Sequence, residues 1–245
     1  AGMWNNSVEK LRVHDCRFVQ NQAEVGGGAI FNDESQVDIT KCQFWFNVAS
    51  REIDVGDDPA CFGGAIAARG GTLRIENSLF VANTAGTEIL DTEGWGGAIA
   101  ALPGAAVRVT QCTFSRNDSA NGYSLYDATE GPGEELGTIT VKGSIFWNES
   151  IEESISHIEA DLSVQVNYSD LQLYDGLAVY PGTGNINEDP LFKGGLLPGL
   201  DSFRVQFTSP CTDGVPTEES LFDDLAGDIR NGADGWVQMG ALENP

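Results

Sequence analysis

Short segments in which apolar and polar residues alternate recur along the chain and share one pattern. Their central residues are Leu11-Arg12-Val13, Val37-Asp38-Ile39, Leu73-Arg74-Ile75, Val107-Arg108-Val109 and Ile139-Thr140-Val141. Residues at i and i+2 of a β-strand point to the same side, so each segment predicts a strand with its apolar residues inward and its middle residue in solvent. Val164-Gln165-Val166, with Ser169 and Leu171 after it, predicts one more strand of the same kind.

Two motifs recur in phase with these strands. The Phe-x-x-Asn motif occurs at Phe18/Asn21, Phe44/Asn47, Phe80/Asn83 and Phe114/Asn117, and Gly-Gly-Ala-Ile begins at Gly27, Gly63 and Gly96. The first Gly precedes the next Phe by 17, 17 and 18 residues, whereas each Asn precedes the next Gly pair by 6, 16 and 13. A nearly constant half and a variable half indicate stacked coils that stay in register while one corner carries insertions.

These repeats predict an all-β fold, a right-handed parallel β-helix of about six to seven coils with an irregular C-terminal cap. We expect one inward column of Phe18, Phe44, Phe80 and Phe114, each burial contributing about 1.5–3 kcal/mol. A hydrogen-bonded ladder of Asn21, Asn47, Asn83 and Asn117 is expected beside it. The Gly pairs allow a corner at which a Cβ would clash. We place the coils in residues 1–181 and a segment that wraps or caps the last coil, in the same domain, in 182–245.

The five cysteines have no metal-binding spacing, and three of them lie in the repeat. Two residues before each Phe, the chain has Cys16, Cys42, Ser78, Cys112 and Ser144. We interpret this column as small inward-facing side chains. A Cys16–Cys42 disulfide between adjacent coils is the alternative, because the coil spacing of about 4.8 Å suits the Cα separation of a disulfide. The state of Cys61 and Cys211 stays open.

Composition restricts the classes of partner. The 37 acidic and 13 basic residues give a formal charge of −24, which disfavours nucleic acids and anionic membranes as ligands. No segment has the roughly 18 consecutive apolar residues of a membrane-spanning helix. The pattern contains no cofactor motif, so we expect that no cofactor is required, although Ca²⁺ remains a candidate ligand.

The two motifs together resemble the repeats of the polymorphic outer membrane protein family, and the resemblance covers roughly residues 1–150. The tail resembles a broader set of bacterial surface-associated β-helix repeat proteins. It carries this resemblance in Asp189-Pro190-Leu191-Phe192, Ser209-Pro210-Cys211-Thr212-Asp213, Asp224-Leu225-Ala226-Gly227-Asp228-Ile229-Arg230 and Met239-Gly240-Ala241-Leu242-Glu243, with Met239 in place of the usual Ile. Both resemblances imply right-handed coils and a secreted or cell-surface location, and neither implies a reaction.

The first residues, Ala1 to Asn6, read like Gly28 to Asp33 in the middle of a coil. We therefore expect an open β-edge at the N-terminal end of the solenoid. Other copies of the chain, joined end to end into filaments, or further β-helix coils would cover that edge.

Candidate chemistry is concentrated at the variable corner, where we expect insertions over residues 48–62, 84–95 and 118–137. They would bring together carboxylates able to bind Ca²⁺, namely Asp54, Asp57, Asp58, Glu88, Asp91 and Glu93, with Glu130, Glu134 and Glu135 one coil further. A solvated acidic face explains the same residues without a metal. Trp95, Tyr123 and Tyr126 at this corner either stack on sugars or anchor the loops.

Two classes of function are compatible with these features. The first is a structural or adhesive extracellular protein that contacts polysaccharide or a host cell surface, with no catalytic residues. The second is a carbohydrate-active protein, either a polysaccharide lyase or a Ca²⁺-dependent carbohydrate-binding module. For the lyase, Arg12, Arg74 and Arg108 occupy equivalent outward positions, although Asp38 interrupts them and a charge ladder explains them equally well.

Overall fold

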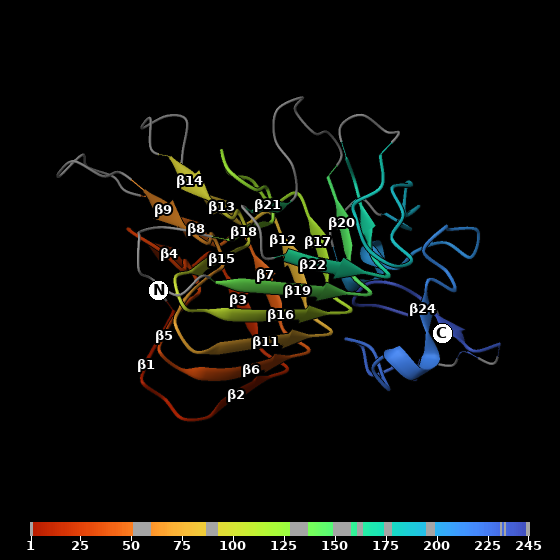
Figure 1. The fold of residues 1–245 in the computed structure, drawn as a ribbon, viewed down its shortest axis with the longest axis horizontal. Coiled ribbons are helices and arrows are strands. Elements are labelled where there is room, and N and C mark those ends of the chain that lie inside the picture. Colours follow the sequence, from red (N-terminus) through yellow and green to blue (C-terminus); the bar gives the residue numbers. More distant parts are fainter. Residues whose placement is uncertain are drawn as a thin grey trace.

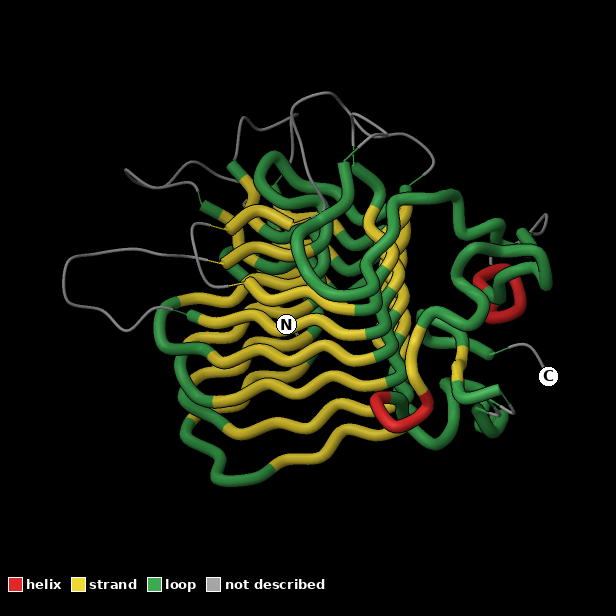
Figure 2. The backbone as a smooth tube through the Cα atoms, turned by 45° about the vertical axis from the view of Figure 1, so that its right-hand side comes forward, coloured by secondary structure: helices red, strands yellow, loops and turns green. Residues whose placement is uncertain are grey.

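The computed structural model describes residues 2–50, 60–86, 93–127, 137–148, 158–160, 164–173, 178–194, 199–230, 232 and 234–243. Three six-stranded parallel sheets run along the molecule (Figures 1 and 2). The first contains β1 (Met3–Asn6), β5 (Ile30–Asp33), β10 (Ile66–Arg69), β15 (Ile99–Leu102), β18 (Leu125–Asp127) and β21 (Ile158–Ala160). The second contains β2 (Leu11–His14), β6 (Gln36–Thr40), β11 (Thr72–Glu76), β16 (Ala106–Thr110), β19 (Thr138–Lys142) and β22 (Val164–Asn167). The third contains β3 (Arg17–Val19), β7 (Gln43–Trp45), β12 (Leu79–Val81), β17 (Thr113–Ser115), β20 (Ile145–Trp147) and β23 (Asp170–Leu171).

Smaller elements complete the coils and the tail. Short parallel sheets are formed by β4 (Gln22–Ala23), β8 (Val48–Ala49) and β13 (Thr84–Ala85), and by β9 (Cys61–Phe62) and β14 (Gly94–Trp95). The tail contributes an antiparallel pair, β24 (Val215–Pro216) and β25 (Trp236–Val237), and two 3₁₀ turns, η2 (Leu200–Phe203) and η3 (Thr217–Glu219). Equivalent strands of successive coils pair in each sheet, so the predicted right-handed parallel β-helix is confirmed.

The phenylalanines of the repeat lie face to face in the core. The ring centroids of Phe18, Phe44, Phe80 and Phe114 are 5.0, 4.6 and 4.7 Å apart, with interplanar angles of 3 to 6°. Phe146 extends the column at 4.5 Å from Phe114. Strand pairing places each ring directly over the ring of the coil before it, so one residue type fills the same space in every coil.

The asparagines form a continuous ladder. Asn83 Oδ1 accepts hydrogen bonds from the backbone N–H and the Nδ2 of Asn47, at 3.0 and 2.9 Å. Its own Nδ2 donates to Asn117 Oδ1 at 2.9 Å and to the Phe44 carbonyl at 3.0 Å. Asn21 and Asn47 are joined in the same way. Both the amide and the backbone of each turn are therefore satisfied by the neighbouring coils.

The two glycines of each Gly-Gly-Ala-Ile motif have different reasons to lack a side chain. Gly27 has a φ of +58°, and a Cβ there would lie 2.1 Å from the Ile30 carbonyl oxygen. At Gly28 a Cβ would instead meet the Gly64 carbonyl oxygen of the next coil at 2.3 Å. The first glycine permits the turn and the second permits the close approach of adjacent coils.

The cysteine and serine column lies inside the coils, and none of the five cysteines, all of them within the described part, forms a disulfide. The alternative of a Cys16–Cys42 bridge is therefore wrong. Cys42 donates its thiol to the Thr40 carbonyl, and Ser78 donates its hydroxyl to the Glu76 carbonyl in the same way. The Cys42 backbone N–H donates to Ser78 Oγ at 3.1 Å. Thiol and hydroxyl thus serve the same position.

The insertion expected over residues 118–137 is wrong in its bounds. Residues 118–127 form a regular part of the next coil, because Asp118 pairs with Thr84 and Leu125 with Ile99. Gly122-Tyr123-Ser124-Leu125 therefore takes the place of Gly-Gly-Ala-Ile, and Gly122 has a φ of +68°. Residues 128–136, with Glu130, Glu134 and Glu135, connect β18 to β19, whereas residues 51–59 and 87–92 follow β8 and β13. Glu130, Glu134 and Glu135 themselves lie outside the described residues.

The tail both ends and flanks the solenoid. Residues 183–187 continue the last coil, since Asp170 pairs with Ile186 and Asn185 Oδ1 accepts the Ser169 N–H. Residues 199–243 lie beside the third sheet, at the right in Figure 2. They pack on its outward residues in two apolar clusters, which contain Trp45, Leu79 and Val81 in one and Ile145 in the other.

Candidate functional site

A row of aromatic side chains runs along the outer face of the first sheet. Trp4 and Phe31 pair in register on β1 and β5, and Tyr126 stands in the same column on β18. Between Phe31 and Tyr126 the column contains the small residues Ala67 on β10 and Ala100 on β15. In these two coils the rings are Phe62 and Trp95, which lie on the short strands β9 and β14 just before β10 and β15. Phe62 and Trp95 stack with centroids 5.4 Å apart, and Trp95 and Tyr126 lie 6.0 Å apart. We call Trp4, Phe31, Phe62, Trp95 and Tyr126 the aromatic row.

The row results from an exchange of large and small residues five positions apart. Successive coils contain Gly26 and Phe31, Phe62 and Ala67, Trp95 and Ala100, and Asn121 and Tyr126. Gly26, Phe62, Trp95 and Asn121 are in register with one another, as are Phe31, Ala67, Ala100 and Tyr126. Each coil therefore places one ring on the same outer face, and the small partner leaves room for it.

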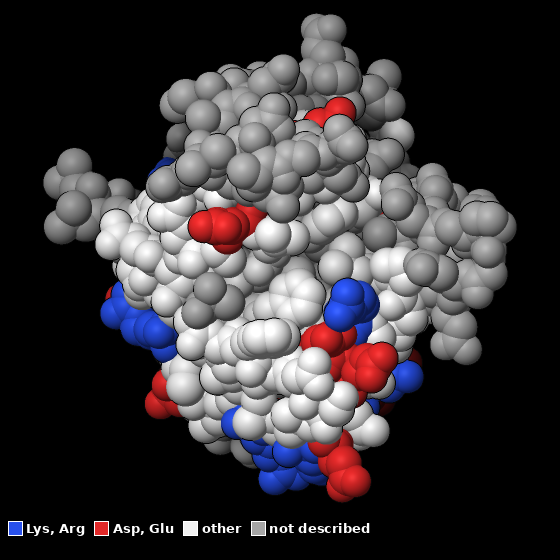
Figure 3. Space-filling model, turned by 90° about the vertical axis from the view of Figure 1, so that its left-hand side faces the viewer, with Lys and Arg blue, Asp and Glu red and all other residues white. Residues whose placement is uncertain are grey.

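The aromatic row is partly open to solvent. Trp4 is 71% exposed, and the other four rings are partly exposed, while Ala67 and Ala100 beneath them are fully buried. Figure 3 views the side on which β1 and β5 lie in Figure 1, and its described atoms are mostly uncharged. A salt bridge between Arg69 and Asp33, with an Nε–Oδ1 distance of 2.9 Å, lies two residues along the same strands. In a chain of charge −24, a mainly uncharged outer face is the exception.

Sequence reasoning found part of this row. Trp95 and Tyr126 were expected together and are in contact. Tyr123, expected with them, is buried, with 6% of its surface exposed. Trp4, Phe31 and Phe62 were missed, although the five-residue exchange of large and small residues was a readable signal once the coil register was known.

The outward column of the second sheet is charged. Strand pairing aligns Arg12, Asp38, Arg74, Arg108, Thr140 and Gln165. All except Asp38 are exposed. The arginines predicted to share a face therefore do so, with Asp38 between Arg12 and Arg74. His14, which is also exposed, pairs with Thr40 two residues away from this column.

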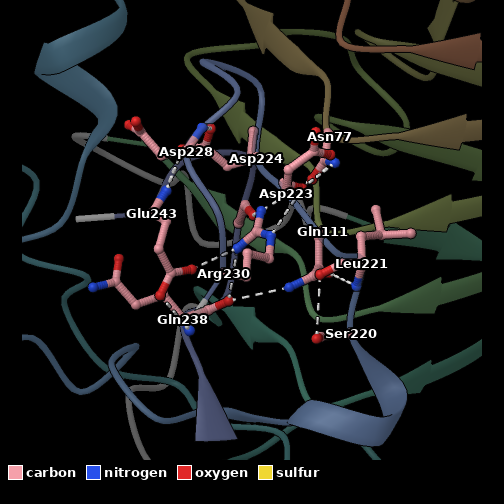
Figure 4. Close-up of polar contacts among 12 residues, drawn as sticks. Asn77, Gln111, Ser220, Leu221, Asp223, Asp224, Asp228, Arg230, Gln238 and Glu243 are labelled. Atoms are coloured by element: carbon pink, nitrogen blue, oxygen red, sulfur yellow. Dashed lines mark hydrogen bonds and ion pairs between the residues drawn. The ribbon is translucent and has the colours of Figure 1, made fainter. Parts of the chain in front are cut away.

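The tail motifs build a buried ionic cluster (Figure 4). The Arg230 side chain is fully buried and donates to Glu243 Oε2 at 2.9 Å, to Asn77 Oδ1 at 3.0 Å and to the Gly240 carbonyl at 2.8 Å. Asp224 accepts the backbone N–H groups of Asp228 and Glu243. Burial raises the pKa of Glu243, and Arg230 opposes this shift. These residues fasten the tail to the coils, so we assign them a structural role.

A second buried polar pair joins the tail to the last coil. The Cys211 thiol donates to Asp170 Oδ2 at 3.1 Å, and the Glu188 backbone N–H donates to Asp170 Oδ1 at 3.2 Å. Burial raises the pKa of Asp170 to about 7, and it also raises the pKa of the Cys211 thiol. Asp170 therefore titrates near neutral pH. Asp170 and Cys211 are both buried beneath the tail, so we assign this pair a structural role.

The predicted Ca²⁺ site falls largely outside the described residues. Asp54, Asp57, Asp58, Glu88 and Asp91 all lie there, and Glu93, the residue before β14, is exposed. The Glu93 carbonyl accepts the Cys61 backbone N–H at 3.0 Å. Within the described ranges, no three His, Cys, Asp or Glu side chains come together as metal ligands. The same ranges contain no helix long and apolar enough to span a membrane.

Comparison with known proteins yields one family. Residues 15–33 match the Chlamydia polymorphic membrane protein (Chlamydia_PMP) repeat. This stretch contains Phe18 and Asn21 as well as the Gly-Gly-Ala-Ile motif at Gly27, so it covers one full set of the repeated residues. No curated protein and no solved structure matches the chain. A cell-surface location is compatible with the family that the repeat describes. The chain is therefore a right-handed parallel β-helix with one stretch that is similar to the polymorphic membrane protein repeat.

Proposed function

We propose that this β-helix is displayed outside the cell as an adhesive and structural protein, and that the aromatic row contacts the sugar rings of a glycan. The observation that carries the proposal is one ring in each of five successive coils, on a mainly uncharged outer face. Coils rise by about 4.8 Å, so the row presents aromatic surface at regular intervals along an extended ligand. Aromatic side chains supply much contact area at low entropic cost and suit the C–H faces of sugars.

The residues of the repeat support a scaffold role rather than catalysis. The phenylalanine and asparagine side chains contact the equivalent residues of neighbouring coils inside the solenoid. Among the described residues, Arg74 and Arg108 have no unpaired Lys or His beside them, since Lys142 forms a salt bridge with Glu219 and His14 lies near Arg12 on β2, at the edge of the sheet. The lyase alternative is therefore less well supported.

Glycan binding tests the proposal. Tryptophan fluorescence and isothermal titration would compare neutral oligosaccharides of several linkages, with Ca²⁺ and with a chelator. A Phe62→Ala/Trp95→Ala variant is expected to bind roughly tenfold more weakly, because central aromatic contacts dominate such interfaces. Phe207→Ala/Phe222→Ala is the matched control, since these tail rings are 76% and 77% exposed. Absence of binding by the native chain, or equal losses in both variants, would refute the proposal. A Ca²⁺ requirement would implicate the acidic residues from Asp54 to Glu93.

We further propose that the edge formed by β1, β2, β3 and β4 receives another coil, either from a second copy or from further β-helix. Met3, Leu11 and Phe18 are partly exposed on this edge, whereas their equivalents Ile30, Val37 and Phe44 in the next coil are buried. At the other end, residues 183–187 occupy the last coil, so end-to-end filaments would have to displace them. Light scattering and electron microscopy test self-assembly, and a stable monomer at high concentration would contradict it.

A further inference from the structure

Two exposed arginines stand side by side on the second sheet. Arg74 on β11 and Arg108 on β16 are paired in register, so their backbones are one coil spacing, about 4.8 Å, apart. Among the described residues, no side chain forms a hydrogen bond or ion pair with either guanidinium. The nearest acidic groups of this face are Glu76, two residues beyond Arg74 on the same strand, and Asp38, which pairs with Arg74 from the other side. The face is uncovered at the front of Figure 1.

The contact between the two arginines is unfavourable for folding, and Asp38, in register with Arg74 on its other side, offsets only the charge of Arg74. Like charges directly opposite each other on neighbouring strands destabilise a sheet. The chain has only 13 basic residues among 245, and it places two of them in direct register. Thr140 occupies the next position in the column. A threonine at position 108 as well would avoid the repulsion. Local rules are broken at functional sites more often than elsewhere, and an anion bridging both guanidinium groups would remove the penalty.

We infer that Arg74 and Arg108 bind the carboxylate or sulfate groups of an acidic polysaccharide lying across the outer face of the second sheet. An arginine offers a fork of N–H donors that matches a carboxylate or sulfate group in two-point contact. Hydroxyl groups surround the pair, because Thr72, Thr110 and Thr140 lie on the same face and can hydrogen bond to sugar hydroxyls. This inference goes beyond the proposed glycan contact, because it concerns a different sheet from the aromatic row.

The surroundings favour a polysaccharide over a nucleic acid. A nucleic acid strand presents phosphates at every nucleotide and needs a basic patch to neutralise several of them. Here the column holds Asp38 on one side of the pair and the uncharged Thr140 and Gln165 on the other. Charges further away than roughly 8 Å are screened at physiological salt, so the net charge of −24 does not cancel the local attraction.

Binding of oligosaccharides of defined charge tests the inference. Oligogalacturonate, a heparin-derived oligosaccharide, a neutral dextran oligosaccharide and single-stranded DNA would be titrated at low and at physiological salt. The native chain is expected to bind one of the two acidic oligosaccharides, and more weakly at higher salt. Preference for oligogalacturonate would indicate carboxylate recognition, and preference for the heparin-derived oligosaccharide would indicate sulfate recognition. Arg74→Gln/Arg108→Gln is expected to lose roughly tenfold or more of this affinity. Arg12→Gln/Arg17→Gln removes the same two charges and is expected to lose about threefold at most.

Stability and neutral-glycan binding provide independent readouts. If the pair is a ligand site, Arg108→Gln should unfold at the same or a higher temperature, because it removes the repulsion and leaves Arg74 opposite Asp38. A lower unfolding temperature would mean that the arginines stabilise the sheet and would overturn the inference. Equal losses in the two double variants, tighter binding of DNA, or no binding of acidic oligosaccharides would also overturn it. Binding of neutral sugars by the aromatic row should be unchanged in Arg74→Gln/Arg108→Gln, so the two proposals can fail separately.

Discussion

The interior of the coils and the interface beneath the tail are both buried, yet different contacts hold them together. Inside the coils a neutral side chain meets a copy of itself, as Asn83 meets Asn47 and Asn117. Beneath the tail, charged groups form pairs that do not recur from coil to coil, such as Arg230 with Glu243. A repeating structure supplies every residue with an identical neighbour, so neutral ladders are sufficient. A segment without a repeat has to satisfy each buried group individually.

The largest effect is expected from breaking the tail side of this comparison. Arg230→Met should destabilise the protein by about 3–5 kcal/mol, because it leaves the buried Glu243 carboxylate without its cation. Urea unfolding measures this loss, and limited proteolysis shows whether the tail detaches first. In the double variant Arg230→Met/Glu243→Gln the loss should be smaller, because no buried charge is left unpaired. A loss below about 1 kcal/mol for Arg230→Met would show that the cluster does not hold the tail.

A pH-dependent effect should come from Asp170. Burial raises the pKa of Asp170 in the folded protein from its ordinary value of 3.8 to about 7, so the folded state binds a proton more tightly than the unfolded state. The stability that this group contributes is therefore complete below pH 4 and is lost as the pH rises through about 7. At about 1.4 kcal/mol per pKa unit, the loss is a few kcal/mol.

Asp170→Asn isolates this contribution. The amide remains neutral, so the variant should be more stable than the native chain at pH 8, and the difference should shrink as the pH falls to 4. Unfolding temperatures measured for both proteins across this range check the prediction. If the unfolding temperatures of the two proteins changed in parallel with pH, Asp170 would not titrate between pH 4 and pH 8.

The same comparison explains what the sequence could reveal. The phenylalanine and asparagine columns were readable because repetition converts sequence spacing into spatial register. Arg230 and Glu243 were recognisable only as parts of tail motifs, and Asp170 was not singled out, because nothing in a non-repeating segment indicates which coil it will contact. The coil formed by β18, β19 and β20 shows the limit of the repeat. Asn148 follows Phe146 by two residues instead of three, and its Oδ1 accepts the Arg116 N–H rather than that of Asn117.

Removing one step of the ladder should have an intermediate effect. Asn83→Ala is expected to cost about 2–3 kcal/mol, because the buried N–H and Nδ2 of Asn47 lose their acceptor. Asn21→Ala should cost only about 1 kcal/mol, since Asn21 is partly exposed and has a ladder partner on one side only. Urea unfolding of both variants checks the ratio, and equal losses would contradict a ladder that is strongest in its interior.

The smallest effect is expected where one coil already contains the substitute. Cys112→Ser should change stability by less than about 1 kcal/mol, because Ser78 fills the same column position one coil away and donates to the carbonyl two residues before it, as Cys112 does. Cys112→Val adds a β-branched methyl group to a fully buried position and cannot donate to the Thr110 carbonyl, so it should be the more damaging change. Differential scanning calorimetry of the two variants tests the argument. If valine were tolerated and serine were not, the column would stabilise the coils by apolar packing alone. The hydrogen bonds of this column would then not be part of what distinguishes the coil interior from the interface beneath the tail.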